Sequence, residues 1–241
     1  MRQSKLRLYC FSPPVMLATF TIEIIFALYT IWRYKMTTIT RLIVAILVFL
    51  AVFQGSEFSA CGHTSLEPGL WSRIGYGAIT MLPPLGLHLA YAIAGKKSKY
   101  LVPFAYMTCA AFLAYFVGFT DSITGQTCYA NYAVFDTHRA SSRLYALYYY
   151  GWLVVGTYLS WAWAKHLKKH QRAALYALSI GYLSFLLPTT TVNLIDPSTI
   201  SGIPSIMCGF AVILAFVLVG KVAPESIKQK ANTSFKFRLP F

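Results

Sequence analysis

The sequence predicts an all-α membrane protein, a bundle of seven transmembrane helices with the N-terminus outside and the C-terminus in the cytoplasm. Three observations support this fold class. The 241 residues are 57% hydrophobic and only 12% charged, apolar runs recur along the chain, and basic residues gather in alternate connections between these runs. Soluble domains average about 25% charged residues, so an ordinary soluble fold is excluded.

Each apolar run is long enough to cross a bilayer, for which a helix needs about 20 residues. The predicted spans are residues 14–32, 41–58, 71–93, 100–119, 143–164, 172–193 and 202–221. Lipid cannot hydrogen-bond a bare backbone, so the spans are expected to be helices, and the short alternating strands of a barrel are absent from the pattern. Residues 1–222 are thus predicted to form one membrane domain, followed by a short basic tail, residues 223–241.

The basic residues predict the orientation. Of the 21 Lys and Arg residues, 15 fall in the first, third and fifth connections and the tail, which is the enrichment expected of cytoplasmic loops. The net charge of +14 then needs no nucleic-acid partner. Seven spans place the N-terminus outside, although Arg2, Lys5 and Arg7 oppose this, so a re-entrant first segment stays open as an alternative. No cleaved signal peptide is expected, because the first run ends in Trp32 and basic residues.

Polar residues inside or near the spans are the candidate ligand-binding residues. Glu23 lies near the middle of the first span, where an ionisable group indicates function by default; it is expected to bind a cation, carry a proton or bond a neighbouring helix. The others lie near the predicted outer ends of different spans, where they can line a shallow pocket. They are Gln54, Glu57, Arg73, Tyr148, Tyr149 and Asn193. The alternative for this outer set is interfacial snorkelling within an aromatic belt.

Prolines within two spans predict hinges. Pro83 and Pro84 are expected to kink the third span, with Gly86 loosening the same point, and Pro188 to kink the sixth. A proline in a membrane helix frees a backbone carbonyl, which side chains of neighbouring helices or water can satisfy. Static packing kinks are the alternative to moving hinges.

Cysteines and histidines suggest two further features. Cys61 and Cys128 both lie in predicted outer connections, where they are expected to form a disulfide, unless both stay free thiols. His88, His166 and His170 lie toward the inner side and could hold zinc as part of a membrane hydrolase. A solvated basic loop explains His166 and His170 more simply, so no catalytic residue, metal or cofactor is predicted.

Two stretches carry a family resemblance. The run WSRIGYGAITMLPPLGLHLAYAIAGKK, residues 71–97, resembles the third-helix region of the seven-helix N-terminal sensory module of bacterial histidine kinases and diguanylate cyclases. The stretch PPVMLATFTIEIIFALYTIWRYK, residues 13–35, is similar to the first helix of that module. The resemblance implies an outside N-terminus and signalling to a cytoplasmic output domain. The residues after Lys221 are too few for such a domain, so a stand-alone module with a separate partner is expected.

The predicted function is therefore that of a non-enzymatic sensor or receptor in the inner or plasma membrane. It would bind a small molecule or lipid from the outer side and signal to a cytoplasmic protein. A transporter or proton-coupled carrier that uses Glu23 is the alternative, and a structural or assembly subunit is a further one.

Overall fold

The computed structural model describes residues 13–60, 68–118, 123–128, 133–137, 139–195 and 203–227. The helices are α1 (Pro13–Arg33), α2 (Thr38–Phe58), α3 (Pro68–Thr80), α4 (Leu82–Ala94), α5 (Leu101–Gly118), α6 (Arg139–Ala164), α7 (Lys169–Ile195), α8 (Ile203–Val217), the π-helical η4 (Leu218–Val222) and α9 (Ala223–Ser226). The strands are β1 (Ile123–Cys128) and β2 (Ala133–Thr137).

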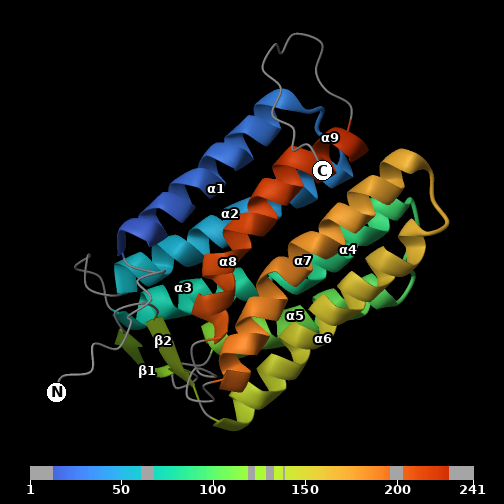
Figure 1. Ribbon diagram of the computed structural model, residues 1–241. Coiled ribbons are helices and arrows are strands. Elements are labelled where there is room, and N and C mark those ends of the chain that lie inside the picture. The colour runs from blue at the N-terminus through green and yellow to red at the C-terminus, as the bar shows by residue number, and fades with distance from the viewer. Residues whose placement is uncertain are drawn as a thin grey trace.

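The helices form the predicted bundle (Figure 1). α2 packs on α1, α3 and α4, while α6 packs on α4 and α7, and α7 packs on α8. α1 begins at the end of the bundle where the β1–β2 hairpin lies, and α9 lies at the opposite end. We call these the hairpin end and the basic end. Helix α1 therefore starts at the end of the bundle opposite to the one where α9 lies.

Among the residues that the structure describes, six helical segments are long and apolar enough to cross a membrane, which indicates a multi-pass membrane protein. They are Pro14–Arg33, Thr38–Phe58, Gly69–Ala94, Leu101–Gly118, Lys169–Ile195 and Gly209–Ser226. α6 is longer than most of them, at 26 residues, but its many Tyr and Trp residues lower its mean hydropathy because their rings carry polar groups. The bundle is thus confirmed, and the seventh crossing stays a prediction.

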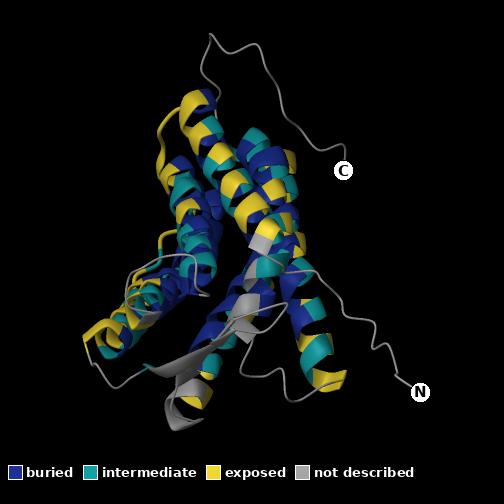
Figure 2. Cartoon of the chain, turned by 90° about the vertical axis from the view of Figure 1, so that its left-hand side faces the viewer, coloured by how far each residue is buried: buried dark blue, intermediate teal, exposed yellow. Residues whose placement is uncertain are grey.

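The outward faces of the helices are apolar, as expected of surfaces in contact with lipid. Figure 2 shows exposed residues along these faces and buried residues between the helices. Leu28, Leu147 and Leu187 are 61%, 73% and 60% exposed. Exposed apolar surface on this scale is unusual for a soluble monomer. In a bilayer it faces acyl chains, and close packing of buried side chains holds the helices together.

Two features of the fold differ from the predicted spans. A two-stranded antiparallel hairpin, β1–β2, lies between α5 and α6, with Gln126 opposite Phe135 and an irregularity between Ile123 and Gly125. The sequence analysis placed only a loop there, so the strands were missed. The last span continues through η4 into α9 as far as Ser226, so the predicted domain boundary at residue 222 falls inside a continuous helical segment.

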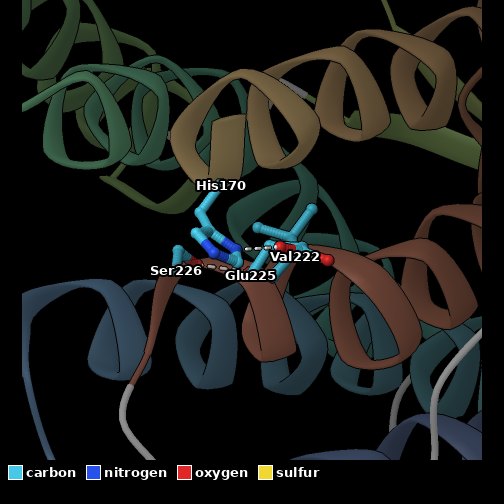
Figure 3. Close-up of polar contacts among 4 residues, drawn as sticks. All are labelled: His170, Val222, Glu225 and Ser226. Atoms are coloured by element: carbon cyan, nitrogen blue, oxygen red, sulfur yellow. Dashed lines mark hydrogen bonds and ion pairs between the residues drawn. The ribbon is translucent and has the colours of Figure 1, made fainter. Parts of the chain in front are cut away.

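At the basic end a polar contact fastens α9 to α7 (Figure 3). His170 Nδ1 lies 2.6 Å from Glu225 Oε2, and the Ser226 hydroxyl donates to the Val222 carbonyl. The Glu225 side chain is nearly buried at 7% exposure, whereas that of His170 is 75% exposed. The contact therefore joins the first turn of α7 to the end of the last helix.

Candidate functional site

The third predicted span is two helices, with a break at Met81. α3 ends at Thr80 and α4 begins at Leu82, with Pro83 and Pro84 in its first turn. A proline has no N–H to donate and its ring clashes with the carbonyl four residues earlier, so a helix is interrupted before it. The structure thus has a break at the point where Pro83 and Pro84 are expected to kink this span.

The break frees the carbonyl of Thr80, which lies four residues before Pro84 and so has no helical donor. Two other helices supply donors instead. The Tyr148 hydroxyl of α6 donates to the Thr80 oxygen at 2.7 Å, and the Cys109 thiol of α5 approaches it at 3.4 Å. An unpaired buried carbonyl is costly, so these contacts stabilise the break and connect α3 and α4 to α5 and α6.

The side chain of Thr80 extends this network, which we call the Thr80 network and define as Thr80, Cys109, Tyr145 and Tyr148. Its hydroxyl donates to the Tyr76 carbonyl at 2.6 Å and lies 3.2 Å from the Tyr145 hydroxyl. Aromatic rings surround it, and the rings of Tyr76, Phe112, Phe116, Tyr145 and Tyr148 contact one another. The polar contacts are thereby enclosed in an apolar shell.

A small central cavity lies next to this break, between α2, α4, α6, α7, α8 and η4. Its volume is about 20 Å³, measured as the space open to the centre of a water molecule, which is room for roughly one water. Tyr149 and Tyr182 are among the residues that line it. The Tyr182 hydroxyl is buried and has no hydrogen-bond partner among the described residues, and the other lining residues are almost all apolar.

Gly86 has a packing role that the sequence analysis did not anticipate. A Cβ at this position would overlap the Tyr182 hydroxyl and would lie 3.1 Å from Cζ of that ring. Gly86 thus lets α7 approach α4 closely, which is the usual role of small residues between membrane helices. The sequence predicts that Gly86 loosens the span, and the structure shows in addition that it makes a tight contact between α4 and α7.

Pro188 does not interrupt its helix, because α7 runs continuously from Lys169 to Ile195 with this proline inside. The hydroxyls of Thr189, Thr190 and Thr191 each donate to a carbonyl four residues earlier. The three acceptors are the carbonyls of Phe185, Leu186 and Leu187, which all precede the proline. The carbonyl that Pro188 deprives of its helical donor is instead that of Ser184, four residues earlier. The helix nevertheless continues past Pro188 and has no break comparable to that at Met81.

The predicted ligand-binding residues are distributed over several interfaces. Tyr148 belongs to the Thr80 network and Tyr149 to the central cavity, and both are buried. Gln54 and Glu57 are buried on α2, at 2% and 1% exposure. Arg73 is half-buried on α3, which packs on α2. Asn193 is half-buried near the end of α7.

Glu23 is completely buried on the stripe of α1 that packs into the bundle. The stripe also contains, at helical spacing, the buried residues Met16, Thr19, Ala27 and Thr30. Neither carboxyl oxygen of Glu23 has a hydrogen-bond partner among the described residues. The predicted bond to a neighbouring helix is therefore not made within that part of the chain.

The three predicted inner histidines do not form a metal site. His88 Nδ1 lies 3.2 Å from the Tyr106 hydroxyl, and His170 contacts Glu225. Within the helices and strands that the structure describes, no group of three His, Cys, Asp or Glu residues could hold a metal ion. His88 and His170 lie on different helices, α4 and α7, and His166 lies in the turn between α6 and α7. The described residues therefore do not bring the three histidines together as a set of metal ligands.

The predicted Cys61–Cys128 disulfide lies outside the described residues, because Cys61 is not among them. Cys109 is described as a buried free thiol. The sequence analysis overlooked its contact with Thr80, as well as Thr80 itself. The sequence does indicate that the Thr80 carbonyl lacks a helical donor, since Thr80 precedes Pro84 by four residues. Nothing in the local sequence indicates which thiol or hydroxyl donates to this carbonyl instead.

Comparison with protein-family models, curated proteins and solved structures finds no significant match for this chain. The resemblance to a bacterial sensory module stays a prediction.

Proposed function

We propose that this chain is a membrane receptor module in which a small polar or amphipathic ligand entering at the hairpin end acts on the α3–α4 break. The observation that carries the proposal is the Thr80 network. A membrane-crossing segment is interrupted there, and its freed carbonyl is held by side chains from two other helices rather than by its own helix.

In this proposal the break has a second hydrogen-bonding state, and ligand binding offsets the cost of leaving the first one. The Tyr148 hydroxyl can donate to the Thr80 carbonyl or turn to another acceptor, and the thiol of Cys109 is a weak donor that holds it loosely. A ligand changes an equilibrium only through its different affinity for the two states. Arg73 lies on α3, the helix that ends at the break. A ligand that contacts polar groups of α3 can therefore bind the two states of the break with different affinities.

The proposed binding residues lie where α2 and α3 pack on each other. Gln54 is 2% exposed, and its Nε2 has no hydrogen-bond partner among the described residues. A buried amide without a partner is costly, so a ligand acceptor at this point gains a hydrogen bond without displacing one. Glu57 lies one helical turn away on the same face. A separate cytoplasmic protein would bind at the basic end and respond to the change in helix positions there.

Spin labels test this proposal when placed on two exposed residues, Leu70 of α3 and Leu147 of α6, with molecules co-purified from the native membrane as ligands. Ligand addition is expected to shift the distance distribution between the labels. Tyr148→Phe should abolish the shift while the ligand still binds, because the variant loses the hydroxyl that couples α6 to the break. Gln54→Leu should abolish binding itself.

Tyr158→Phe is the matched control, since Tyr158 is 68% exposed on the same helix. It should respond as the wild-type protein does. A ligand-dependent shift of wild-type size in Tyr148→Phe would overturn the coupling role of the Thr80 network.

A second candidate, a proton-coupled carrier, is favoured by Glu23. A carboxyl group that is fully buried and without a hydrogen-bond partner in the described part of the chain is the type of group that takes up and releases protons in transporters. Purified protein in liposomes is expected to show pH-driven flux that Glu23→Gln eliminates. Thr19→Ala, on the same buried stripe, should keep the flux. Equal flux in wild type and Glu23→Gln would end this candidate.

A further inference from the structure

A second recess, which we call the basic pocket, opens at the basic end of the bundle. It lies between the first turn of α2, the last turns of α4 and the start of α5, and its volume is about 620 Å³. That size is within the range of about 300–1,000 Å³ typical of small-molecule sites. The residues that define it here are Thr38, His88, Tyr91, Lys96, Lys97 and Ser98.

The rim of the basic pocket is cationic. Lys96 and Lys97 follow directly after α4 and are exposed, and no acidic residue is among those that line the pocket. Lys96 Nζ also lies 5.1 Å from the ring centroid of Trp163, which holds this charge in place at the rim. Among the described residues of the basic end, Glu225 is a carboxylate, and it is bound to His170. The rim charges are therefore not compensated by a neighbouring acid within the pocket.

Two helices add to this positive potential because both begin at the basic pocket. The first N–H groups of a helix have no partner within it and carry partial positive charge. In α2 the Thr37 side chain accepts from the Thr40 N–H, while Thr38 and Ile39 line the pocket. In α5 the Ser98 hydroxyl oxygen accepts from the Val102 N–H at 2.9 Å. These cap side chains take up the N–H groups of Thr40 and Val102, while the two lysines and the two helix starts together favour a negative charge at this recess.

Below the rim the pocket becomes apolar. It reaches from Lys96, just after α4, back along this helix to His88, and the separation of six residues between Ala94 and His88 corresponds to roughly 9 Å at 1.5 Å per helical residue. Tyr91, Ala92 and Val102 line this deeper part, with the His88–Tyr106 contact at its inner limit. A molecule that fits must carry a negative charge at one end and an apolar portion at the other.

We infer that the basic pocket binds the phosphate-bearing headgroup of an anionic phospholipid. The cationic rim lies where the membrane helices end, which is the depth of the lipid phosphate, and the apolar part points along the helices toward the acyl region. α4 forms one wall of the recess and packs on both α2 and α5. Basic pockets between membrane helices are a recurrent form of lipid recognition.

Native mass spectrometry of the full chain tests this inference. The protein is taken from nanodiscs that contain phosphatidylcholine with a minority of phosphatidylglycerol, and the lipids that stay bound are counted. Wild-type protein is expected to retain phosphatidylglycerol in preference to phosphatidylcholine. Lys96→Gln with Lys97→Gln should weaken this retention by about tenfold or more, because each charged hydrogen bond contributes roughly that factor.

Two comparisons separate a built pocket from diffuse attraction. Lys165→Gln with Lys169→Gln removes the same charge from exposed positions at the basic end that do not line the pocket. Phosphatidylglycerol retention should then change less than about twofold, because exposed surface charges contribute little to binding. Ala92→Phe keeps every lysine but fills the apolar part, and it should release phosphatidylglycerol. Thermal unfolding of each variant verifies that the bundle is intact.

Three results would overturn the inference. Wild-type protein could show no preference for phosphatidylglycerol, the control pair could lose as much lipid as the pocket pair, or inorganic phosphate and glycerol phosphate could displace the lipid and bind with equal affinity. The last result would identify a soluble phosphate compound as the ligand in place of a lipid.

Discussion

Tyr148→Phe is expected to destabilise the bundle by about 1–3 kcal/mol, the cost of leaving a buried polar group unsatisfied. The change removes one hydroxyl and leaves the ring in its aromatic surroundings. The Thr80 carbonyl then keeps only the 3.4 Å approach of the Cys109 thiol, which is a weak donor. In a bilayer no water is available to replace the lost bond. Reversible unfolding in mixed detergent and dodecyl sulfate measures the free energy of unfolding directly.

Tyr158→Phe is the control for this change, since it makes the same substitution on an exposed ring of α6. Its free energy of unfolding should stay within about 0.5 kcal/mol of the wild-type value. Cys109→Ser combined with Tyr148→Phe should recover part of the lost stability, because a serine hydroxyl donates more strongly than a thiol. Equal stabilities of Tyr148→Phe and Tyr158→Phe would show that the Thr80 carbonyl is satisfied in another way.

Gly86→Ala is expected to destabilise by about 1–3 kcal/mol, the range typical of overpacking in a filled interior. Its new methyl group would overlap the Tyr182 hydroxyl. The ring has little freedom to retreat, because Tyr182 is only 3% exposed and Gly156 and Phe185 lie beside it. The overlap must therefore be relieved by separation of α4 from α7, which also enlarges the central cavity.

Gly151→Ala is the matched control for Gly86→Ala, since a Cβ at Gly151 meets nothing within 4 Å. It should be neutral or stabilise by up to about 1 kcal/mol, because alanine is the better helix former. Adding Tyr182→Phe to Gly86→Ala should restore part of the stability, as it removes the overlapped hydroxyl. The double-mutant cycle then gives a favourable coupling energy. Additive effects would show that these two residues do not meet.

The prolines show how far local sequence carries a prediction of the candidate site. Pro83 and Pro84 predicted an interruption, and the missing N–H of Pro84 identifies the Thr80 carbonyl as the freed group by simple counting. At Pro188 the same counting identifies the Ser184 carbonyl, but here α7 stays continuous. The presence of a proline therefore does not by itself decide whether a span is divided into two helices, and the kink predicted at Pro188 stays a prediction.

The β1–β2 hairpin was missed for a different reason. Its strands have only six and five residues, too short for a period of two to stand out beside long apolar runs. Its pairing also depends on two segments finding each other, which neither segment indicates alone. An irregularity near Met81 can be predicted because proline affects only the helical turn before it. Strand pairing, by contrast, depends on two separate segments of the chain.

Hydropathy and charge alone determined that this protein is a multi-pass helical bundle and where most helices lie, because transfer of a helix into lipid depends on the composition of each segment by itself. The partners of the buried polar groups were decided only by tertiary structure. The Thr80 carbonyl is met by residues 29 and 68 positions away, and the Gly86 contact joins α4 to α7. Membrane helices all have apolar surfaces, so the sequence of one helix does not indicate which other helices it contacts. These contacts are determined only by the packing of the whole bundle.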